Sequence, residues 1–348
     1  MNKYIKYTGV ACVMMGSLTF HSCSIDVDPQ DRIHESAVWA DPSTAELYID
    51  GLYAEFKRFQ FGQFPDLGYD NAMDALADIM KFTSNTPGNG TVNMLVSNAN
   101  YFSPASVGLN YWSSGYTRIR RINEAISGLK NKSILSDDDK TKYEAEARFI
   151  RAYTYFWLAK IHGSVIIFEN LEQYSNKDNP RSSEEDVYDF IIGDLNFAAE
   201  NLPRTHLDGR ATKGAAYALL SRVALHAGSI AKYDRNQYNT DPLTGISQNR
   251  ANEYFTEAAN AALKVVELAN EGLYDLDANF ASIFTNKRTK EAIFRVDFVA
   301  PSVTHQYDLG YAPPKDAPGS TLVYGVPTAE LADEFEMANG TKFDWDNP

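Results

Sequence analysis

The residue types that most often carry catalysis are scattered along this chain. Beyond the first 22 residues the histidines are His34, His162, His206, His226 and His305, without metal-ligand spacing. The sequence contains no HExxH, GxSxG, P-loop or paired CxxC motif. These patterns predict no metal site, no cofactor and no nucleophilic catalysis.

Carboxylates are abundant, and the 46 Asp and Glu residues leave open a glycoside hydrolase with an unrecognised carboxylate pair. Asp137, Asp138 and Asp139 stand together but lack the spaced oxygen ligands of a calcium loop. We interpret them as the solvated start of a helix.

Charge and aromatic content narrow the class of ligand. The formal net charge of −14 argues against nucleic acid and against anionic lipid headgroups as partners. The chain is 13% aromatic, with 21 Tyr and 19 Phe residues. Aromatic rings stack on the apolar faces of sugars, and a Tyr hydroxyl can bond to sugar hydroxyls. The composition is therefore compatible with a neutral glycan as ligand.

The most regular helical pattern is EAEARFIRAYTYFWLAKIHGSV, residues 144–165. Glu144 and Arg148 have the spacing of an exposed ion pair, Ser136 can cap the start of the helix, and Gly163 can end it. His162 and His226 are expected at helix ends, bonded to the last carbonyls. The apolar positions of this helix recur at steps of three and four: Ala147, Ile150, Thr154, Trp157, Leu158 and Ile161. This periodicity predicts a helix whose one face packs into a core, with Arg151 and Trp157 serving that packing.

Further helical patterns surround it and suggest an internal repeat. They cover residues 116–129, 182–203, 211–228 and 252–272. RFIRAYTYFWLAKIHG aligns with KGAAYALLSRVALHAG so that Gly163 stands opposite Gly228. In each case an insertion and a second helix follow. The pattern predicts a mainly α fold of tetratricopeptide-like helix pairs with lengthened turns; a generic helical bundle is the alternative.

The flanking regions are less regular. Residues 43–59 predict a helix with Leu47, Leu52, Phe56 and Phe59 on one side, and Ser43 with Glu46 has the spacing of a capping box. A short helix is expected at 71–80 and a strand at 291–301. Two tracts are rich in loop-forming residues: the first tract, 81–106, and the second tract, 300–320. Another helix is expected to begin near residue 327.

The N-terminal residues predict export. Lys3 and Lys6 precede an apolar run that is too short to cross a bilayer, as in a secretory signal peptide. Cys23 directly follows this region, which predicts cleavage after residue 22 and acylation of Cys23, with an ordinary signal peptide as the alternative. Because Cys12 lies within residues 1–22, the mature chain would have no internal disulfide. Residues 23–42 would then form a polar tether, and no other segment is apolar enough to cross a membrane.

Six segments in order resemble the SusD/RagB-like outer-membrane nutrient-binding lipoproteins. They are YTRIRRINEAI (116–126), EAEARFIRAYTYFWLAKIHG (144–163), NPRSSEEDVYDFIIGDLNFAAENLP (179–203), GRATKGAAYALLSRVALHAG (209–228), NEGLYDLDANFASIF (270–284) and PTAELADEFEMANG (327–340). The sequence departs from the family in HGSVIIF, which lacks the usual proline, and in the bulky residues before Cys23. Family members also continue beyond Trp345, so we expect a C-terminally truncated chain.

The resemblance implies a non-catalytic, lipid-anchored protein of the outer membrane and cell surface. Such a protein binds an oligosaccharide or polysaccharide and delivers it to a SusC-type TonB-dependent transporter. Residues 43–348 would form one SusD-like domain, with tetratricopeptide-like helices mainly at 112–270 and an irregular, loop-rich ligand-binding subdomain. Within the two tracts we select as ligand-binding residues Asn98, Tyr101, Phe102, Tyr307 and Tyr311. A peptide- or protein-binding scaffold of the same fold is the main alternative, and the glycan itself is not specified by any motif.

Overall fold

The computed structural model describes residues 35–54, 56, 78–82, 111–205, 209–234, 243–299, 301 and 325–346. Their elements, in chain order, are α2 (Glu35–Ala40), α3 (Pro42–Tyr53), β1 (Met80–Phe82), α6 (Trp112–Asn131), α7 (Asp137–His162), η5 (Glu172–Ser175), α8 (Glu184–Asn201), α9 (Lys213–Tyr233), η6 (Gln248–Arg250), α10 (Ala251–Asn270), α11 (Ser282–Thr285), β2 (Gly325–Pro327) and α13 (Ala329–Asp333). The predicted mainly α fold is confirmed.

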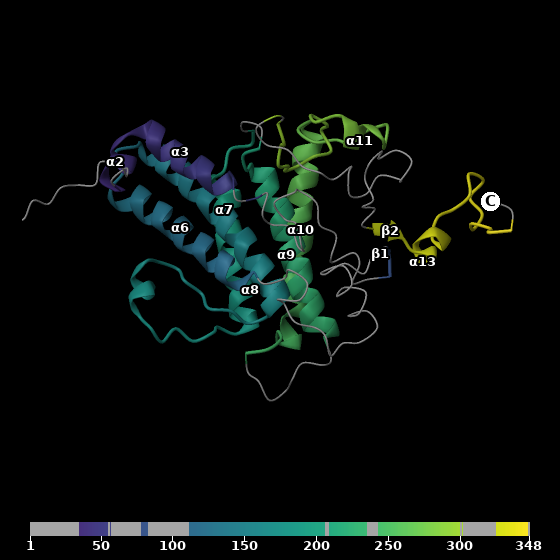
Figure 1. Ribbon diagram of the computed structural model, residues 1–348, viewed down its shortest axis with the longest axis horizontal. Coiled ribbons are helices and arrows are strands. Elements are labelled where there is room, and N and C mark those ends of the chain that lie inside the picture. Colours follow the sequence, from purple (N-terminus) through teal and green to yellow (C-terminus); the bar gives the residue numbers. More distant parts are fainter. Residues whose placement is uncertain are drawn as a thin grey trace, which may run out of the picture.

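Helices α6 to α10 form a frame in which each helix packs against the next along the chain (Figure 1). The turns between α7 and α8 and between α9 and α10 are long and contain η5 and η6 respectively. Helix α3 covers α6 and α7 at one side of this frame. The helix pairs with lengthened turns thus match the predicted architecture.

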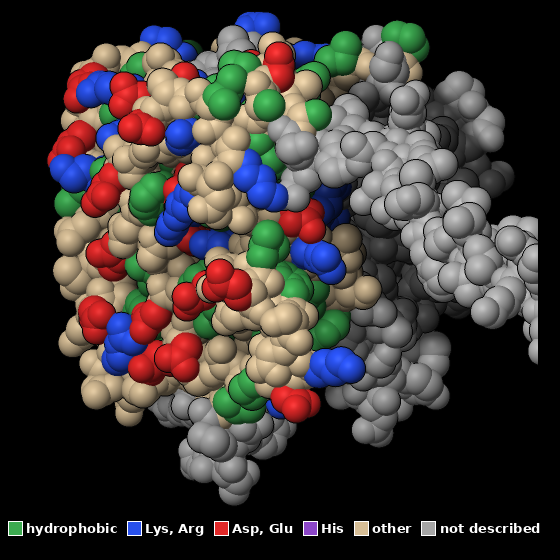
Figure 2. All heavy atoms as spheres, turned by 90° about the vertical axis from the view of Figure 1, so that its left-hand side faces the viewer, with side chains coloured by type: hydrophobic (Ala, Val, Ile, Leu, Met, Phe, Trp, Pro, Cys, Tyr) green, Lys and Arg blue, Asp and Glu red, His purple; other side chains and the backbone are tan. Residues whose placement is uncertain are grey.

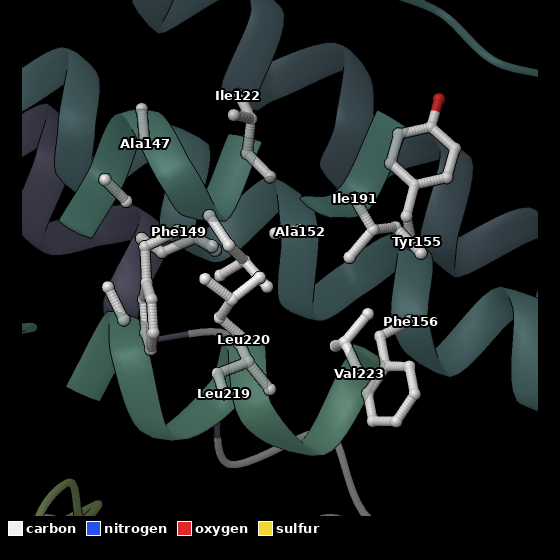
Figure 3. Packing of buried hydrophobic residues seen from close by; sticks show 14 of the residues in the cluster. Ile122, Ala147, Phe149, Ala152, Tyr155, Phe156, Ile191, Leu219, Leu220 and Val223 are labelled. Atoms are coloured by element: carbon white, nitrogen blue, oxygen red, sulfur yellow. The ribbon is translucent and has the colours of Figure 1, made fainter. Parts of the chain in front are cut away.

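The core of the frame is formed by the apolar faces expected from the sequence. Ile119, Ile122 and Leu129 of α6 are at most 1% exposed, as are Val187 and Ile191 of α8. Figure 3 shows how α9 meets α7: the side chains of Leu219, Leu220 and Val223 lie against those of Phe149 and Phe156. Burial of these side chains removes a large apolar area from water, which is the main force that holds the helices together.

Helix α7 begins and ends as its sequence predicts. Ser136 Oγ accepts a hydrogen bond from the Asp139 backbone N–H at 3.1 Å. Gly163 follows the last helical residue with φ 65°, a left-handed conformation that glycine adopts at little cost. The Glu144–Arg148 pair forms, but Glu144 is buried and also binds Lys130, so the prediction that the pair is exposed was wrong.

Helix α9 does not end at Gly228 but continues to Tyr233. The glycine serves close packing instead, because a Cβ atom there would lie 2.8 Å from the ring of Phe255 on α10. His226 therefore lies inside the helix, where its Nδ1 atom hydrogen-bonds the Tyr188 hydroxyl at 2.8 Å. Its predicted position at a helix end was wrong, whereas His162 is the last residue of α7.

Two predictions for the N-terminal helix were also wrong. Asp41 caps α3 by accepting the Ser43 and Thr44 backbone N–H groups, so Ser43 is inside the helix. Its inward face carries Ala45, Ile49 and Leu52 at steps of four and three, whereas Leu47, five residues before Leu52, lies off this face and is 66% exposed. Phe56 is buried as expected, and Phe59 lies outside the described residues.

The expected helix at 71–80 and strand at 291–301 need correction as well. Met80 belongs to strand β1, and the part of the predicted helix before Asp78 lies outside the described residues. Residues 291–299 form no strand. They instead place Ile293 and Phe294 against the frame, where Phe294 contacts Phe149 and Phe56 with ring centroids 5.3 and 5.1 Å apart. In this segment, contacts with the helices of the frame thus take the place of the strand pairing that β-branched residues favour.

Candidate functional site

The two short strands bring together chain segments that are about 245 residues apart in the sequence. Strand β1 pairs antiparallel with β2, with Met80 opposite Pro327 and Phe82 opposite Gly325. The first tract begins within β1 and continues after Phe82, and the chain enters β2 at Gly325 shortly after the second tract. In an antiparallel pair these two positions are at the same end. Both tracts are therefore attached to one end of the same two-stranded ribbon, which consists of β1 and β2.

Backbone hydrogen bonds hold the opposite end of the ribbon. The Thr328 backbone N–H donates to the Ile79 carbonyl at 3.1 Å, and the Thr328 hydroxyl donates to the Asp78 carbonyl. The same hydroxyl accepts the Leu331 N–H at 3.2 Å and so caps α13. In Figure 1 the ribbon and α13 lie beyond α10, on the side of the frame away from α6.

The other two ends of the tracts are attached to the frame. Tyr111, just after the first tract, is buried, and its hydroxyl accepts a hydrogen bond from the guanidinium of Arg118 on α6. Before the second tract, Phe298 offers its carbonyl to Lys287 Nζ at 3.2 Å, and Ile293 and Phe294 pack on α7 and α9. The frame and the ribbon thus fix both ends of each tract.

A buried ion pair holds α7 to α8 within this frame. Arg151 Nε and Nη2 each donate to one carboxylate oxygen of Asp194 at 2.7 Å, and Nη1 donates to Asn123 Oδ1 at 2.7 Å. Arg151 is 3% exposed and Asp194 is 2% exposed. Burial opposes the charge of Arg151, but the Asp194 carboxylate outweighs this effect and the pKa of the guanidinium is raised. Arg151 has the packing role expected of it.

A second arginine ties the N-terminal helix to the frame. Arg210 Nη1 donates to Glu146 Oε2 at 2.8 Å, and its Nη2 reaches Asp50 and Glu46 on α3. Burial lowers the pKa of Arg210, but the buried Glu146 carboxylate more than offsets this and the pKa is raised. The Tyr53 hydroxyl accepts the neighbouring Ala211 N–H at 3.0 Å. This cluster is a structural joint, since each of its charges has a partner.

Two cavities adjoin the segment that precedes the second tract. One, of about 220 Å³, is lined by residues that include Arg210, Tyr274 and Ile293. The other, of about 370 Å³, opens between α7 and α9. The sequence had indicated neither cavity, although Tyr153, Trp157 and Lys160 stand at steps of four and three, which places them on one face of α7.

The site residues selected from the sequence all lie outside the described residues: Cys23, Asn98, Tyr101, Phe102, Tyr307 and Tyr311. Among the residues that the structure does describe, no group of three or more His, Cys, Asp or Glu side chains could hold a metal ion. No helix of that part is both long and apolar enough for a membrane span. For the candidate site, the structure shows where the two tracts are attached to the ribbon and to the frame.

The tetratricopeptide-like helix pairs of the frame define the fold class of the described residues. Residues 66–225 match the family model SusD-like_3, described as "Starch-binding associating with outer membrane". A SusD-like protein of Bacteroides ovatus is 40% identical over 117 residues, which are 33% of this chain and 21% of that protein. Over residues 66–225, somewhat less than half of this chain, the sequence is thus similar to the SusD-like proteins.

Solved structures agree on the fold. A SusD-like protein from Bacteroides fragilis superposes with a TM-score of 0.69 at 26% identity, covering 91% of this chain and 57% of that chain. A laminarin-binding SusD-like protein superposes with a TM-score of 0.58 at 22% identity, covering 75% of this chain and 52% of that one. The chain spans between 21% and 54% of the lengths of the four curated relatives that it matches.

Proposed function

We propose that this protein is a non-catalytic glycan-binding lipoprotein of the cell surface. It would capture oligosaccharides and deliver them to a SusC-type TonB-dependent outer-membrane transporter. The observation that carries the proposal is the register of the ribbon, in which Phe82 lies opposite Gly325. This register attaches both aromatic-containing tracts to one point, as a two-sided ligand site requires. The family's printed description and the laminarin-binding neighbour support a glycan as the ligand.

We assign the ligand contacts to the two tracts. Tyr101 and Phe102 of the first tract and Tyr307 and Tyr311 of the second would stack on sugar rings, and Asn98 would bond to sugar hydroxyls. Contacts of this kind give modest affinity for one sugar unit. A polymer would raise the apparent affinity by presenting many units at high effective concentration.

The same proposal includes a lipid anchor at Cys23 and the transporter as partner. Cys23 would carry the lipid and hold the protein at the outer membrane, with residues 23–42 as the tether. The ligand would then be bound next to the transporter. Mass spectrometry of the mature N-terminus tests the first part, because an unmodified Cys23 contradicts lipid anchoring. Co-purification of a barrel protein with the membrane-bound chain tests the second, and purification without one contradicts the partnership.

Affinity electrophoresis through gels that contain laminarin, starch or other neutral polysaccharides tests the ligand. We expect at least one polymer to retard the protein without releasing reducing sugar. Replacing Tyr101 and Phe102 together by alanine, or Tyr307 and Tyr311 together, should weaken that retention by roughly tenfold, ~1.4 kcal/mol. Tyr233→Ala is the matched control, since this tyrosine is 62% exposed at the end of α9.

Three outcomes would contradict the proposal. Release of sugar products would indicate a glycoside hydrolase. Binding of peptides in place of all glycans would indicate the scaffold alternative. Retention that survives both double substitutions would place the glycan outside the two tracts.

A further inference from the structure

The cavity of about 370 Å³ lies between α7, α9 and residues 291–294. Its volume is within the range of about 300–1,000 Å³ that is typical of small-molecule sites, near the lower end. Tyr153 and Phe149 line it from α7, Leu219 and Arg222 from α9, and Phe294 from the covering segment. Most of the lining residues are apolar or aromatic, and the two charged ones are Arg222 and Glu291.

A row of side chains on α7 continues from this cavity along the helix. Tyr153 and Trp157 pack edge to face with ring centroids 6.1 Å apart. Lys160 follows one turn later, and its Nζ atom lies 4.1 Å from the centre of the Trp157 ring and 5.4 Å from that of Phe156. The aromatic faces thus hold the ammonium group next to the row.

Arg222 of α9 brings a second positive charge to the same place. Its guanidinium acts electrostatically on both Tyr153 and Lys160. Burial lowers the pKa of Lys160, and the charge of Arg222 lowers it further. Within the part of the chain that the structure describes, neither Lys160 nor Arg222 forms an ion pair or a hydrogen bond.

The neighbouring titratable groups do not neutralise this pair. Glu291 also lines the cavity, and its carboxylate, which accepts the Asp277 backbone N–H at 2.8 Å, offsets only one of the two positive charges. His226 is close enough to Lys160 for the lysine charge to depress its pKa, after the larger effect of burial. The cleft therefore carries excess positive charge in a chain whose net charge is −14.

This arrangement differs from the charge pairs found elsewhere on the described part of the frame. Figure 2 shows one face of the molecule, where acidic and basic side chains are interspersed. Most basic groups of the frame have carboxylate partners, as in the pairs of Arg120 with Glu124 and of Arg250 with Asp189. Two adjacent cations without such a partner repel each other, and a bound anion would relieve that repulsion.

We propose that the α7–α9 cleft binds an acidic sugar unit, with its anionic group on Lys160 and Arg222 and its ring against Tyr153 and Trp157. The anionic group is a uronate carboxylate or a sulfate ester, both of which a guanidinium and an ammonium can bind. The proposal rests on the proposed glycan-binding function and adds a second site, separate from the two tracts.

Isothermal titration calorimetry of the full chain with three probes tests the proposal. Trigalacturonate presents carboxylates, carrageenan oligosaccharides present sulfate esters, and laminarin oligosaccharides are neutral. We expect at least one acidic probe to bind, with an affinity that falls as salt is raised. Arg222→Gln and Lys160→Gln should each weaken that binding at least tenfold and reduce its dependence on salt.

The control variants distinguish binding at the α7–α9 cleft from a general effect of positive charge and from binding at the two tracts. Lys342→Gln removes one exposed positive charge elsewhere and should leave binding of the acidic probe unchanged. Replacing Tyr101 and Phe102 together by alanine should weaken binding of the neutral probe and leave binding of the acidic probe unchanged. If the neutral probe binds while both acidic probes do not, the cleft proposal is wrong and the proposed function stands.

Two further results would overturn the proposal. One is binding of an acidic probe that Arg222→Gln and Lys160→Gln leave unchanged. The other is equal or tighter binding of a hexaglutamate peptide that depends on the same two residues, because the cleft would then recognise acidic peptides and not sugars. Circular dichroism before each titration excludes variants that have lost their helical structure.

Discussion

Arg151 in the frame is 3% exposed, whereas Trp345, beyond the ribbon, is 60% exposed. The frame is fixed by interlocking apolar faces and by buried ion pairs such as Arg151–Asp194. The ribbon is fixed by a three-residue strand pairing and by the bonds of Thr328 to residues 78 and 79. The frame thus carries the stability and one end of each tract, and the lightly held ribbon carries the other end of each. Local opening of the second region should require far less free energy than unfolding of the first.

The largest expected effect is on the buried ion pair. Arg151→Ala leaves the buried Asp194 carboxylate without its main partner, which should lower the free energy of unfolding by about 3–5 kcal/mol. Chemical denaturation measures this change. Arg120→Ala is the control, because its pair with Glu124 is exposed and should contribute less than about 1 kcal/mol. Equal losses in the two variants would show that the frame does not depend on its buried pair.

A smaller effect is expected from two glycines of the frame. Gly163→Ala forces a side chain into a left-handed conformation at φ 65°, which should cost roughly 1–2 kcal/mol. Gly193→Ala, inside α8 with no atom within 4 Å of the added Cβ, should instead stabilise the protein by up to about 1 kcal/mol. Thermal denaturation of both variants gives the signs. An increase in stability on Gly163→Ala would contradict the left-handed conformation of this residue at the end of α7.

The pH dependence of the frame should respond to His226. Burial lowers the pKa of this imidazole, so the folded state binds fewer protons than the unfolded state. The contribution is complete above the unfolded pKa of about 6.5, and it is lost progressively as the pH falls from there through the lower pKa of the folded state. His226→Gln should therefore reduce the loss of stability between pH 7.5 and pH 5.5. An unchanged slope would mean that the buried histidine is not linked to folding.

The smallest effect on global stability is expected in the ribbon. Thr328→Ala removes the cap of α13 and the hydroxyl bond to Asp78. Because the ribbon adds little to the core, the global free energy of unfolding should change by less than about 0.5 kcal/mol. Hydrogen exchange should nevertheless become faster at residues 80–82 and 325–333 and stay unchanged in α7. A large global loss would mean that the ribbon is part of the main folding unit.

Periodicity was enough to predict the frame, because its helices have apolar faces that repeat at steps of three and four. Ile119 and Ile122 of α6 and Val187 and Ile191 of α8 are buried as that rule requires. The rule failed in two segments outside the frame, α3 and residues 291–299. Leu47 is five residues before Leu52, a spacing that takes it off the buried face, and at residues 291–299 packing on helices replaced a strand.

The site was less predictable for a physical reason. The pairing of Phe82 with Gly325 joins two segments far apart in the sequence, and no local pattern encodes it. The α7–α9 cleft likewise needs Arg222 of one helix beside Lys160 of another. The family resemblance indicated the two aromatic-containing tracts, and the roles of Tyr101 and Tyr307 are proposals that binding measurements test.

A double-substitution cycle tests most directly whether the two tracts form one glycan site. Binding of the retained neutral glycan is measured for the unchanged protein, Tyr101→Ala, Tyr307→Ala and the double variant. If both tracts contact the same sugar, each single change weakens binding, and the double variant loses less than the sum by at least about 0.5 kcal/mol. Strict additivity, or an effect confined to one tract, would contradict the account.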